Sequence, residues 1–292
     1  MAERLATRNP WIAGLRIMRP GNVAMMVIGC VAVRHGLIEP WGEPHRSGTN
    51  AWIATVALAL LGAGGNVIND YFDLKEDRIN KPRYAFVGTV LRRRDALALH
   101  LGLTAAGLGL AGWLAFREGN GWVGVFAVGM ALLLGLYSPV FKRGFLRGNV
   151  AIALAVGALP VWVAFGPDAA RPEVAAGISL YAGLSAWITG LREVVKDIQD
   201  RAGDAAFGYT TLPVVWGEVR TWRLLHRTMA MTWIPLVAVA WHTLDRGGWW
   251  AAYLLPFALA HRAVIQEDKR AASSWLKAAL GGGLLAVAFG AG

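Results

Sequence analysis

The sequence contains little charge and almost no cysteine. Asp, Glu, Lys and Arg make up only 16% of its 292 residues while hydrophobic residues make up 55%, which excludes an ordinary soluble domain. The single cysteine, Cys30, leaves no intrachain disulfide possible and indicates no thiolate metal site. The six histidines are scattered without the spacing of metal ligands. We therefore assign no chemistry to cysteine or histidine.

Long polar linkers and low-complexity tracts are also missing, and apolar stretches of membrane-spanning length recur along the whole chain. In lipid, backbone groups are satisfied only in helices or in a closed barrel, and runs of about twenty residues without alternation favour helices. We predict an all-α integral membrane protein, a single domain over residues 1–292. Its nine transmembrane helices are expected at 21–38, 51–72, 95–115, 121–139, 149–166, 174–191, 228–244, 249–266 and 274–291.

The net charge of +10 would suggest a nucleic-acid partner in a soluble protein. Here, however, the basic residues concentrate in the N-terminal segment and in every second connection between the predicted helices. The positive-inside rule explains this pattern and places the N-terminus on the cytoplasmic side. We expect no nucleic-acid partner and no signal peptide, because residues 1–20 are basic and lack a short apolar core with a cleavage site.

A dense acidic cluster follows the second apolar run. Asn69, Asp73 and Asp77 recur every four residues, so on a helix they project from nearly one face, and Asp70 lies beside the first of them. Carboxylate and amide oxygens are ligands that Mg²⁺ prefers, and Mg²⁺ commonly completes its coordination with water and substrate phosphates. A solvated helix end paired with nearby Lys and Arg is the alternative interpretation. The long apolar run before the cluster weighs against it.

A second acidic stripe follows the sixth apolar run. Glu193, Asp197, Asp200 and Asp204 again share one helical face, and the charge count places both stripes on the same side of the membrane. Two facing carboxylate stripes would repel each other unless cations neutralised them. Two or more Mg²⁺ ions that bridge the stripes to a diphosphate would resolve this repulsion.

Such an arrangement suits an allylic diphosphate. Metal ions and basic side chains would stabilise the departing diphosphate, and an acceptor atom would attack the allylic carbocation that remains. The apolar helices would hold the isoprenoid tail. The basic candidates for holding the diphosphate are Lys75, Arg78, Lys81, Lys142, Arg143, Arg192 and Lys196.

These motifs together resemble the UbiA superfamily of membrane prenyltransferases, over essentially the whole chain. The first family signature, Asn-x-x-x-Asp-x-x-x-Asp, matches Asn69, Asp73 and Asp77, and the second, Asp-x-x-x-Asp, matches Asp200 and Asp204. Two further family elements match Tyr137-Ser138-x-x-x-Lys142, followed by Gly148-Asn149, and Arg19-Pro20-x-Asn22. The details around Arg19 and Asn66 look most like the branch that includes digeranylgeranylglyceryl phosphate synthases.

The resemblance implies Mg²⁺-dependent transfer of a polyprenyl group from its diphosphate to a lipophilic acceptor, an activity of the EC 2.5.1 class. The residues expected to carry catalysis are Asp73, Asp77, Asp200 and Asp204. The metal ligands are expected among Asn69, Asp70, Asp73, Asp77, Asp197, Asp200 and Asp204. The substrate pocket is expected to include Arg19, Asn22, Asn66, Tyr137, Ser138 and Asn149.

Several alternatives stay open from the sequence. The branch implies a geranylgeranylglyceryl phosphate acceptor, but an aromatic acceptor such as 4-hydroxybenzoate, or another quinone, chlorin or haem precursor, fits the same motifs. Acidic residues near helix ends also occur in ion-coupled transporters, although transporter sites lie near the bilayer midplane. A third alternative is an inactive scaffold, against which the intact set of acids argues. We expect a prokaryotic inner membrane and an active site that faces the cytoplasm.

Overall fold

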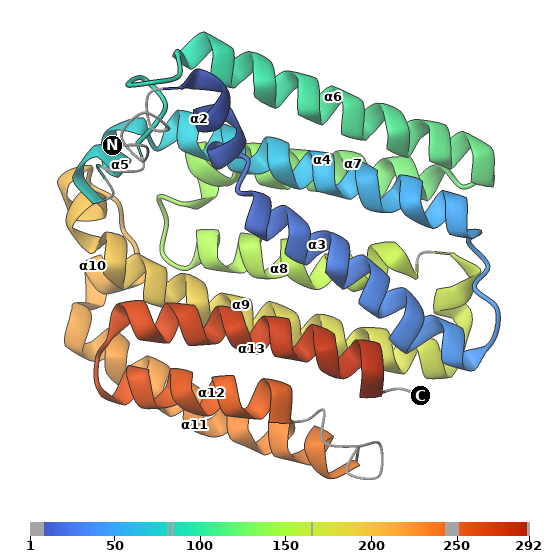
Figure 1. Cartoon of the computed structure of the whole chain (residues 1–292). Helices are drawn as coiled ribbons and strands as arrows, with labels where there is room; N and C mark the ends of the chain where they lie inside the picture. Colours follow the sequence, from blue (N-terminus) through green and yellow to red (C-terminus); the bar gives the residue numbers. More distant parts are fainter. Residues whose placement is uncertain (1–8, 81, 83–84, 165, 243–250, 291–292) are drawn as a thin grey trace. The chain divides into compact units, whose positions relative to one another are not determined.

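The protein is helical throughout the residues that the structure describes. The computed structural model describes residues 9–80, 82, 85–164, 166–242 and 251–290 (Figure 1), and its only strand-like pairing in these ranges is an isolated bridge between Val87 and Leu91. The all-α prediction is confirmed. The α-helices are α2 (Pro10–Ile17), α3 (Pro20–Val33), α4 (Gly48–Phe72), α5 (Leu74–Asn80), α6 (Arg93–Glu118), α7 (Gly121–Leu136), α8 (Arg147–Val163), α9 (Pro172–Ala206), α10 (Leu212–Trp216), α11 (Glu218–His242), α12 (Ala251–Ile265) and α13 (Lys269–Gly290). Short 3₁₀ and π turns are η1 (Arg34–Ile38), η2 (Glu39–Trp41), η3 (Tyr137–Phe141) and η4 (Pro167–Ala170).

Six helical segments among the described residues are long and apolar enough to cross a membrane, and α8 and α12 are shorter apolar helices. The prediction of an integral membrane protein is thereby supported. Each predicted range overlaps a helix, although residues 165, 243–244, 249–250 and 291 of those ranges lie outside the described residues. The six segments are Pro20–Trp41, Gly48–Phe72, Arg93–Glu118, Gly121–Phe141, Pro172–Ala206 and Lys269–Phe289.

The chain divides into two compact units. The first combines Met1–Val27 with Arg46–Phe141, and the second combines Ile28–His45 with Lys142–Gly292. The first acidic signature belongs to the first unit and the second signature to the second unit.

In the first unit, α4 packs along α6 and α7 (Figure 1). Small residues allow the close approach of these helices, since Gly65 faces the side chain of Leu134 on α7, and Gly107 on α6 faces the backbone of Ala57 on α4. At the end of α4 that leads to the first signature, Ile17 of α2 packs with Val67 in a buried cluster. The amphipathic helix α2 thus covers the end of the bundle where the acidic residues lie.

The opposite end of α4 is held by a buried polar clamp. Arg46 donates from Nε to Oε1 of Glu118 at 2.9 Å and from Nη2 to Oε2 at 3.1 Å, and Asn50 Nδ2 donates to the same carboxylate at 3.2 Å. A two-pronged pair of this kind fixes geometry as well as charge. It ties the start of α4 to the last residue of α6, and so sets the register of the two helices.

In the second unit, α9 packs against α8 and α13, and α13 packs along α12 (Figure 1). Helix α9 has 35 residues and is therefore about 52 Å long, well beyond the roughly 30 Å of a hydrocarbon core. The predicted span at 174–191 continues without a break through the second signature. Buried residues such as Trp222, Phe257 and Leu276 fill the core between the helices.

Two neighbouring glycines on α13 test this packing. A Cβ added at Gly282 would overlap the carbonyl oxygen of Ala252 on α12, whereas a Cβ at Gly281 would meet no heavy atom within 4 Å. We expect Gly282→Ala to lower the free energy of unfolding by about 1–3 kcal/mol because of overpacking. Gly281→Ala, the matched control, should be neutral or slightly stabilising because alanine favours helix. Thermal unfolding in detergent micelles measures both, and equal midpoints would contradict the close contact.

Candidate functional site

The first acidic signature spans a change of helix. α4 ends at Phe72, Asp73 is its C-terminal cap, and α5 begins at Leu74. The Asp73 N–H donates to the Asn69 carbonyl at 2.9 Å, and the Asp77 N–H donates to the Asp73 carbonyl at 2.8 Å. The shared face of Asn69, Asp73 and Asp77 stays a prediction, because the regular helix is interrupted between α4 and α5. Asp73 is buried.

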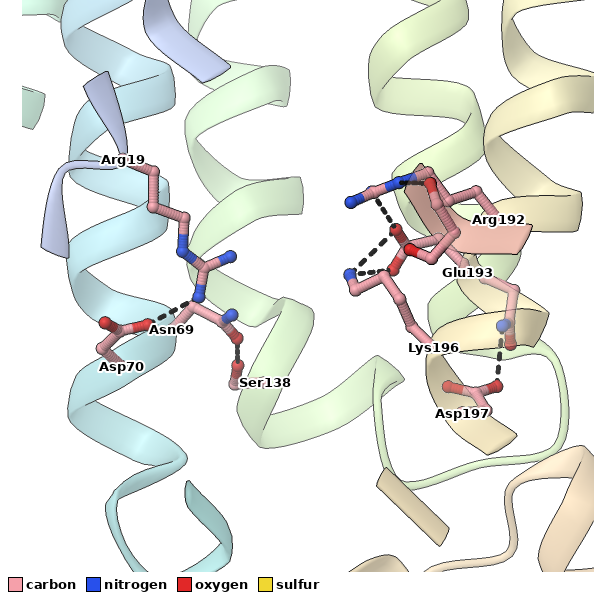
Figure 2. Close-up of polar contacts among 10 residues, drawn as sticks. Arg19, Asn69, Asp70, Ser138, Arg192, Glu193, Lys196 and Asp197 are labelled. Atoms are coloured by element: carbon pink, nitrogen blue, oxygen red, sulfur yellow. Dashed lines mark hydrogen bonds and ion pairs between the residues drawn. The ribbon is translucent and has the colours of Figure 1, made fainter. Parts of the chain in front are cut away.

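Two residues that were predicted for the substrate pocket contact this signature directly, and a third holds the segment that precedes Arg19. Arg19 donates from Nη2 to Oδ1 of Asp70 at 2.7 Å, and the Ser138 hydroxyl donates to the side-chain oxygen of Asn69 (Figure 2). Asn66 Nδ2 donates to the Met18 carbonyl at 3.0 Å and so holds the residue that precedes Arg19. Whether these residues also contact a substrate stays a prediction.

Arg19 occupies an unusual backbone conformation between α2 and α3. Its φ is 54°, a left-handed value that costs a non-glycine residue of the order of 1 kcal/mol. Burial lowers the pKa of Arg19, but the carboxylates of Asp70, Asp77 and Asp73 outweigh that effect, so its pKa lies above the ordinary value. Arg19 is therefore a permanent positive charge beside the first signature.

The π-turn η3 at the end of α7 positions Ser138. Pro139 lacks an N–H and interrupts the regular helix, and the resulting turn buries Ser138 against α4. The neighbouring Tyr137 is half-buried, as is Asn22 near the start of α3. The Tyr-Ser pair therefore lies in a π-turn, which the spacing of the two residues alone does not predict.

Of the basic residues predicted near this signature, Lys75 and Arg78 lie exposed on α5. Lys81 lies outside the described residues. Glu76, which sequence reasoning did not single out, is buried in the same helix with only 6% of its surface exposed. Its place three residues after Asp73 is the one sequence signal that it faces inward.

The second signature lies on the polar end of α9 in the second unit. Asn149 on α8 donates from Nδ2 to Oδ2 of Asp197 at 2.7 Å (Figure 2). Asp204 is buried and accepts a hydrogen bond from the Thr211 hydroxyl at 3.1 Å. Asp200, on the turn between them, is half-buried. The predicted Asn149 therefore contacts Asp197 of the second signature, and Thr211 is a partner that no sequence motif indicates.

Two predicted diphosphate-binding residues gather around Glu193. Lys196 Nζ lies 2.9 and 2.7 Å from the two carboxylate oxygens, and Arg192 Nη1 lies 3.5 Å from Oε1 (Figure 2). Arg192 also donates from Nε to the Ser273 carbonyl at 3.3 Å. Glu193 is buried and was not predicted as a site residue. Its spacing from Lys196 is that of a helical ion pair and could have indicated the contact.

Lys142 and Arg143 lie in the loop between η3 and α8. The Arg143 carbonyl accepts hydrogen bonds from the N–H of Thr210 at 3.0 Å and from its hydroxyl at 3.1 Å. The Arg143 guanidinium lies 5.6 Å from the ring centroid of Tyr209. Lys142 is half-buried. This loop therefore rests on the segment that follows the second signature.

The donor chemistry of both signatures fits Mg²⁺. In the described part of the chain, no group of three or more His, Cys, Asp or Glu side chains is arranged to hold a metal by itself. Each signature instead offers carboxylate oxygens, together with the Asn69 amide oxygen in the first unit. Mg²⁺ takes such hard ligands in small number and completes its octahedron with water and phosphate oxygens. The residues present suit a metal that arrives with a diphosphate.

Comparison with known proteins places this site in context. A family model described as the UbiA prenyltransferase family matches residues 23–283. The chain is 35% identical over 209 residues, 70% of each chain, to the digeranylgeranylglyceryl phosphate synthase of Methanopyrus kandleri. It is 31% identical over 279 residues to the protein of that name from Methanothrix thermoacetophila, which covers 94% of this chain and 98% of the relative.

Solved structures share the fold. One, described as giving insights into the biosynthesis of digeranylgeranylglyceryl phosphate synthase in membranes, matches with a TM-score of 0.63 and 24% identity, and the match covers 96% of this chain and 97% of the other. Another, a UbiA homologue from Archaeoglobus fulgidus bound to GPP and Mg²⁺, matches with a TM-score of 0.58 and 18% identity, over 95% and 98% of the two chains. These likenesses confirm a helical membrane fold of the UbiA type.

A double-mutant cycle tests the ion pair beside the first signature. We expect Arg19→Gln and Asp70→Asn each to destabilise the protein, and the double variant to lose less than the two single losses together. The coupling energy should be about 1–2 kcal/mol for a partly buried, hydrogen-bonded pair. Chemical unfolding of the four proteins in micelles measures it. Additive losses would show that the pair contributes nothing.

Proposed function

Because the chain belongs to the UbiA prenyltransferase family, we propose that it transfers a polyprenyl group from an allylic diphosphate to geranylgeranylglyceryl phosphate. One observation carries the proposal: the oxygen-bearing residues of the first signature gather at the end of the apolar helix α4, where Asp73 is buried and Asp70 pairs with Arg19. The acceptor is proposed because relatives at 31–35% identity bear the name digeranylgeranylglyceryl phosphate synthase.

The proposed reaction breaks the bond between the allylic carbon and the diphosphate oxygen. The electron pair leaves with the diphosphate, a hydroxyl oxygen of the acceptor attacks the allylic carbocation, and that hydroxyl loses its proton. Mg²⁺, when bound, would neutralise the charge that develops on the leaving diphosphate. Asp73, Asp77, Asp200 and Asp204 are the proposed catalytic ligands, with Asn69 and Asp197 as further oxygen donors. Asp70, which was predicted among the metal ligands, forms an ion pair with Arg19.

Basic side chains would hold the diphosphate oxygens. The proposed set retains Arg78, Lys81, Lys142, Arg143, Arg192 and Lys196, of which Arg192 and Lys196 already lie at the Glu193 carboxylate. Glu193 would therefore orient these two cations and limit their motion in the absence of substrate. This role follows from charge: a buried carboxylate is stable only with compensating partners.

We also propose nine membrane crossings with the N-terminus in the cytoplasm of a prokaryotic cell. Three helices beyond the six long apolar segments, namely α8, α11 and α12, would supply the remaining crossings. The bias of Lys and Arg toward alternate connections supports the orientation. It would expose both acidic signatures to the cytoplasmic pool of prenyl diphosphate.

The acceptor is tested by a transfer assay in membranes that express the chain. Radiolabelled geranylgeranyl diphosphate is supplied with Mg²⁺ or EDTA, and geranylgeranylglyceryl phosphate and 4-hydroxybenzoate are offered in parallel. We expect a Mg²⁺-dependent product with the glyceryl phosphate alone. Product with the aromatic acceptor alone would contradict the proposed acceptor and indicate a quinone-type enzyme.

Loss of either signature should stop catalysis. We expect Asp73→Ala and Asp200→Ala to lower turnover by at least about a hundredfold, because leaving-group charge would no longer be stabilised. Asp95→Ala, which removes an acid that belongs to neither signature and is paired with Arg92 and Arg94, is the matched control and should keep activity. Unchanged thermal midpoints would establish that the variants fold. Near-normal turnover in either signature variant would refute the assignment.

Lys142 should affect binding of the diphosphate more than turnover. We expect Lys142→Gln to raise the KM for prenyl diphosphate several-fold with a smaller change in kcat, since a phosphate contact made in the ground state contributes to binding. Arg94→Gln, an exposed substitution at the start of α6, provides the comparison. An unchanged KM would make Lys142 an orientation charge only.

A further inference from the structure

The outward face of α11 carries a stripe of side chains that begins with three arginines, each about one helical turn after the last, and continues with apolar residues. At about 100° per residue, Arg220, Arg223 and Arg227 lie within roughly 60° of one another around the helix axis, and all three are exposed. The same face continues through Met231, Ile234 and Trp241, which are 70%, 74% and 72% exposed. The stripe therefore changes from basic to apolar along a single face.

The opposite face of α11 is occupied by the protein. Trp222, Leu225, Met229 and Leu236 are buried in the core of the second unit. The contact of His226 with His261, whose ring nitrogens lie 3.0 Å apart, and the edge-on packing of Trp233 against Phe257 join α11 to α12. The basic and apolar stripe is thus the face that α11 leaves to its surroundings.

No acidic residue in the described part of the chain compensates the charge on this face. The only acidic residue of α11, Glu218, lies toward the opposite side and pairs with Lys269 and Arg201. None of the acidic side chains that the structure describes forms an ion pair with the three stripe arginines. On the neighbouring helix, Arg262 follows His261 and is exposed as well.

The depth of the arginines matches the headgroup region of a bilayer. At about 1.5 Å per residue, Arg220 to Arg227 covers about 10 Å, and Arg227 to Trp241 covers about 21 Å of mostly apolar surface. The apolar part accounts for most of a hydrocarbon core about 30 Å thick. If Met231 to Trp241 lies among acyl chains, the arginines lie at the level of the lipid phosphates.

We propose that this stripe is a binding site for an anionic phospholipid. The headgroup phosphate would be held by Arg220, Arg223 and Arg227, and an acyl chain would lie along Met231 and Ile234. Charge complementarity identifies the headgroup, because clustered arginines at the membrane surface attract anionic lipid. The apolar continuation identifies a lipid over a free anion. The inference uses the proposed crossing of α11 but not the proposed reaction.

Native mass spectrometry of the full-length protein in detergent tests the site. The protein is titrated with dioleoylphosphatidylglycerol or with dioleoylphosphatidylcholine, and the bound fraction is measured. We expect tighter binding of the phosphatidylglycerol, and at least about a tenfold loss of its affinity in R220Q/R223Q/R227Q. Affinity for phosphatidylcholine should not change.

The matched control is R92Q/R93Q/R94Q, which removes the same charge elsewhere. These arginines are consecutive and therefore point in different directions, Arg92 and Arg94 pair with Asp95, and Arg93 lies 4.6 Å from the ring centroid of Tyr71. The control should keep its preference for phosphatidylglycerol. An equal loss in the control, an unchanged preference in the α11 variant, or displacement of the lipid by inorganic phosphate would each overturn the proposal.

Two further measurements keep the test decisive. If the triple variant does not fold, the single variants R223Q and R227Q replace it, and at least a threefold loss of affinity is expected in each. Transferase activity is measured in the same preparations. If the α11 variant keeps transferase activity but loses its preference for phosphatidylglycerol, the lipid site is supported independently of the reaction. If the protein prefers phosphatidylglycerol but has no transferase activity, the proposed function fails and the lipid site stands.

Discussion

The free energy of placing carboxylates at the ends of apolar helices constrains this whole structure. A buried carboxylate is costly unless hydrogen bonds and opposite charges compensate it. Asp70 is compensated by Arg19 and Glu193 by Lys196, and one oxygen of Asp204 accepts a hydrogen bond from the Thr211 hydroxyl. The helices, turns and loops around each signature are arranged so that these partners reach the acids.

This constraint explains local features that would otherwise be unfavourable. Arg19 adopts a left-handed backbone between two helices, and η3 interrupts α7 at a proline. Both features bring a polar side chain to the first signature, Arg19 to Asp70 and Ser138 to Asn69. In the second unit, the long α9 carries its acids past the apolar part of the helix, where α8 supplies Asn149. Backbone strain and helix breaks are therefore concentrated where the charges need partners.

Much of the fold could be predicted from the sequence, because membrane helices are recognisable as apolar runs of about twenty residues. Helix ends were harder. The polar residues after position 191 do not stop α9, which continues to Ala206, since Lys, Glu and Gln favour helix as much as apolar residues do. The break at Asp73 was not foreseen either.

The candidate site was predictable in its composition more than in its contacts. The pairing of Lys196 with Glu193 follows from a three-residue spacing and could have been read from the sequence. The pairing of Arg19 with Asp70 spans 51 residues and depends on the turn between α2 and α3, so no local pattern contains it. Glu76 and Thr211 were missed for the same reason: burial of one polar residue is decided by its neighbours in space.

The central claim is that the acidic residues of both signatures bind a diphosphate together with its metal ion. Calorimetric titration of the purified protein with geranylgeranyl thiolodiphosphate, an analogue that resists ionisation, tests it most directly. The account predicts tight binding with Mg²⁺, at least about a tenfold loss in EDTA, and a similar loss when Asp77 or Asp204 is changed to Asn. Equal affinity with and without Mg²⁺, or in the variants, would contradict it.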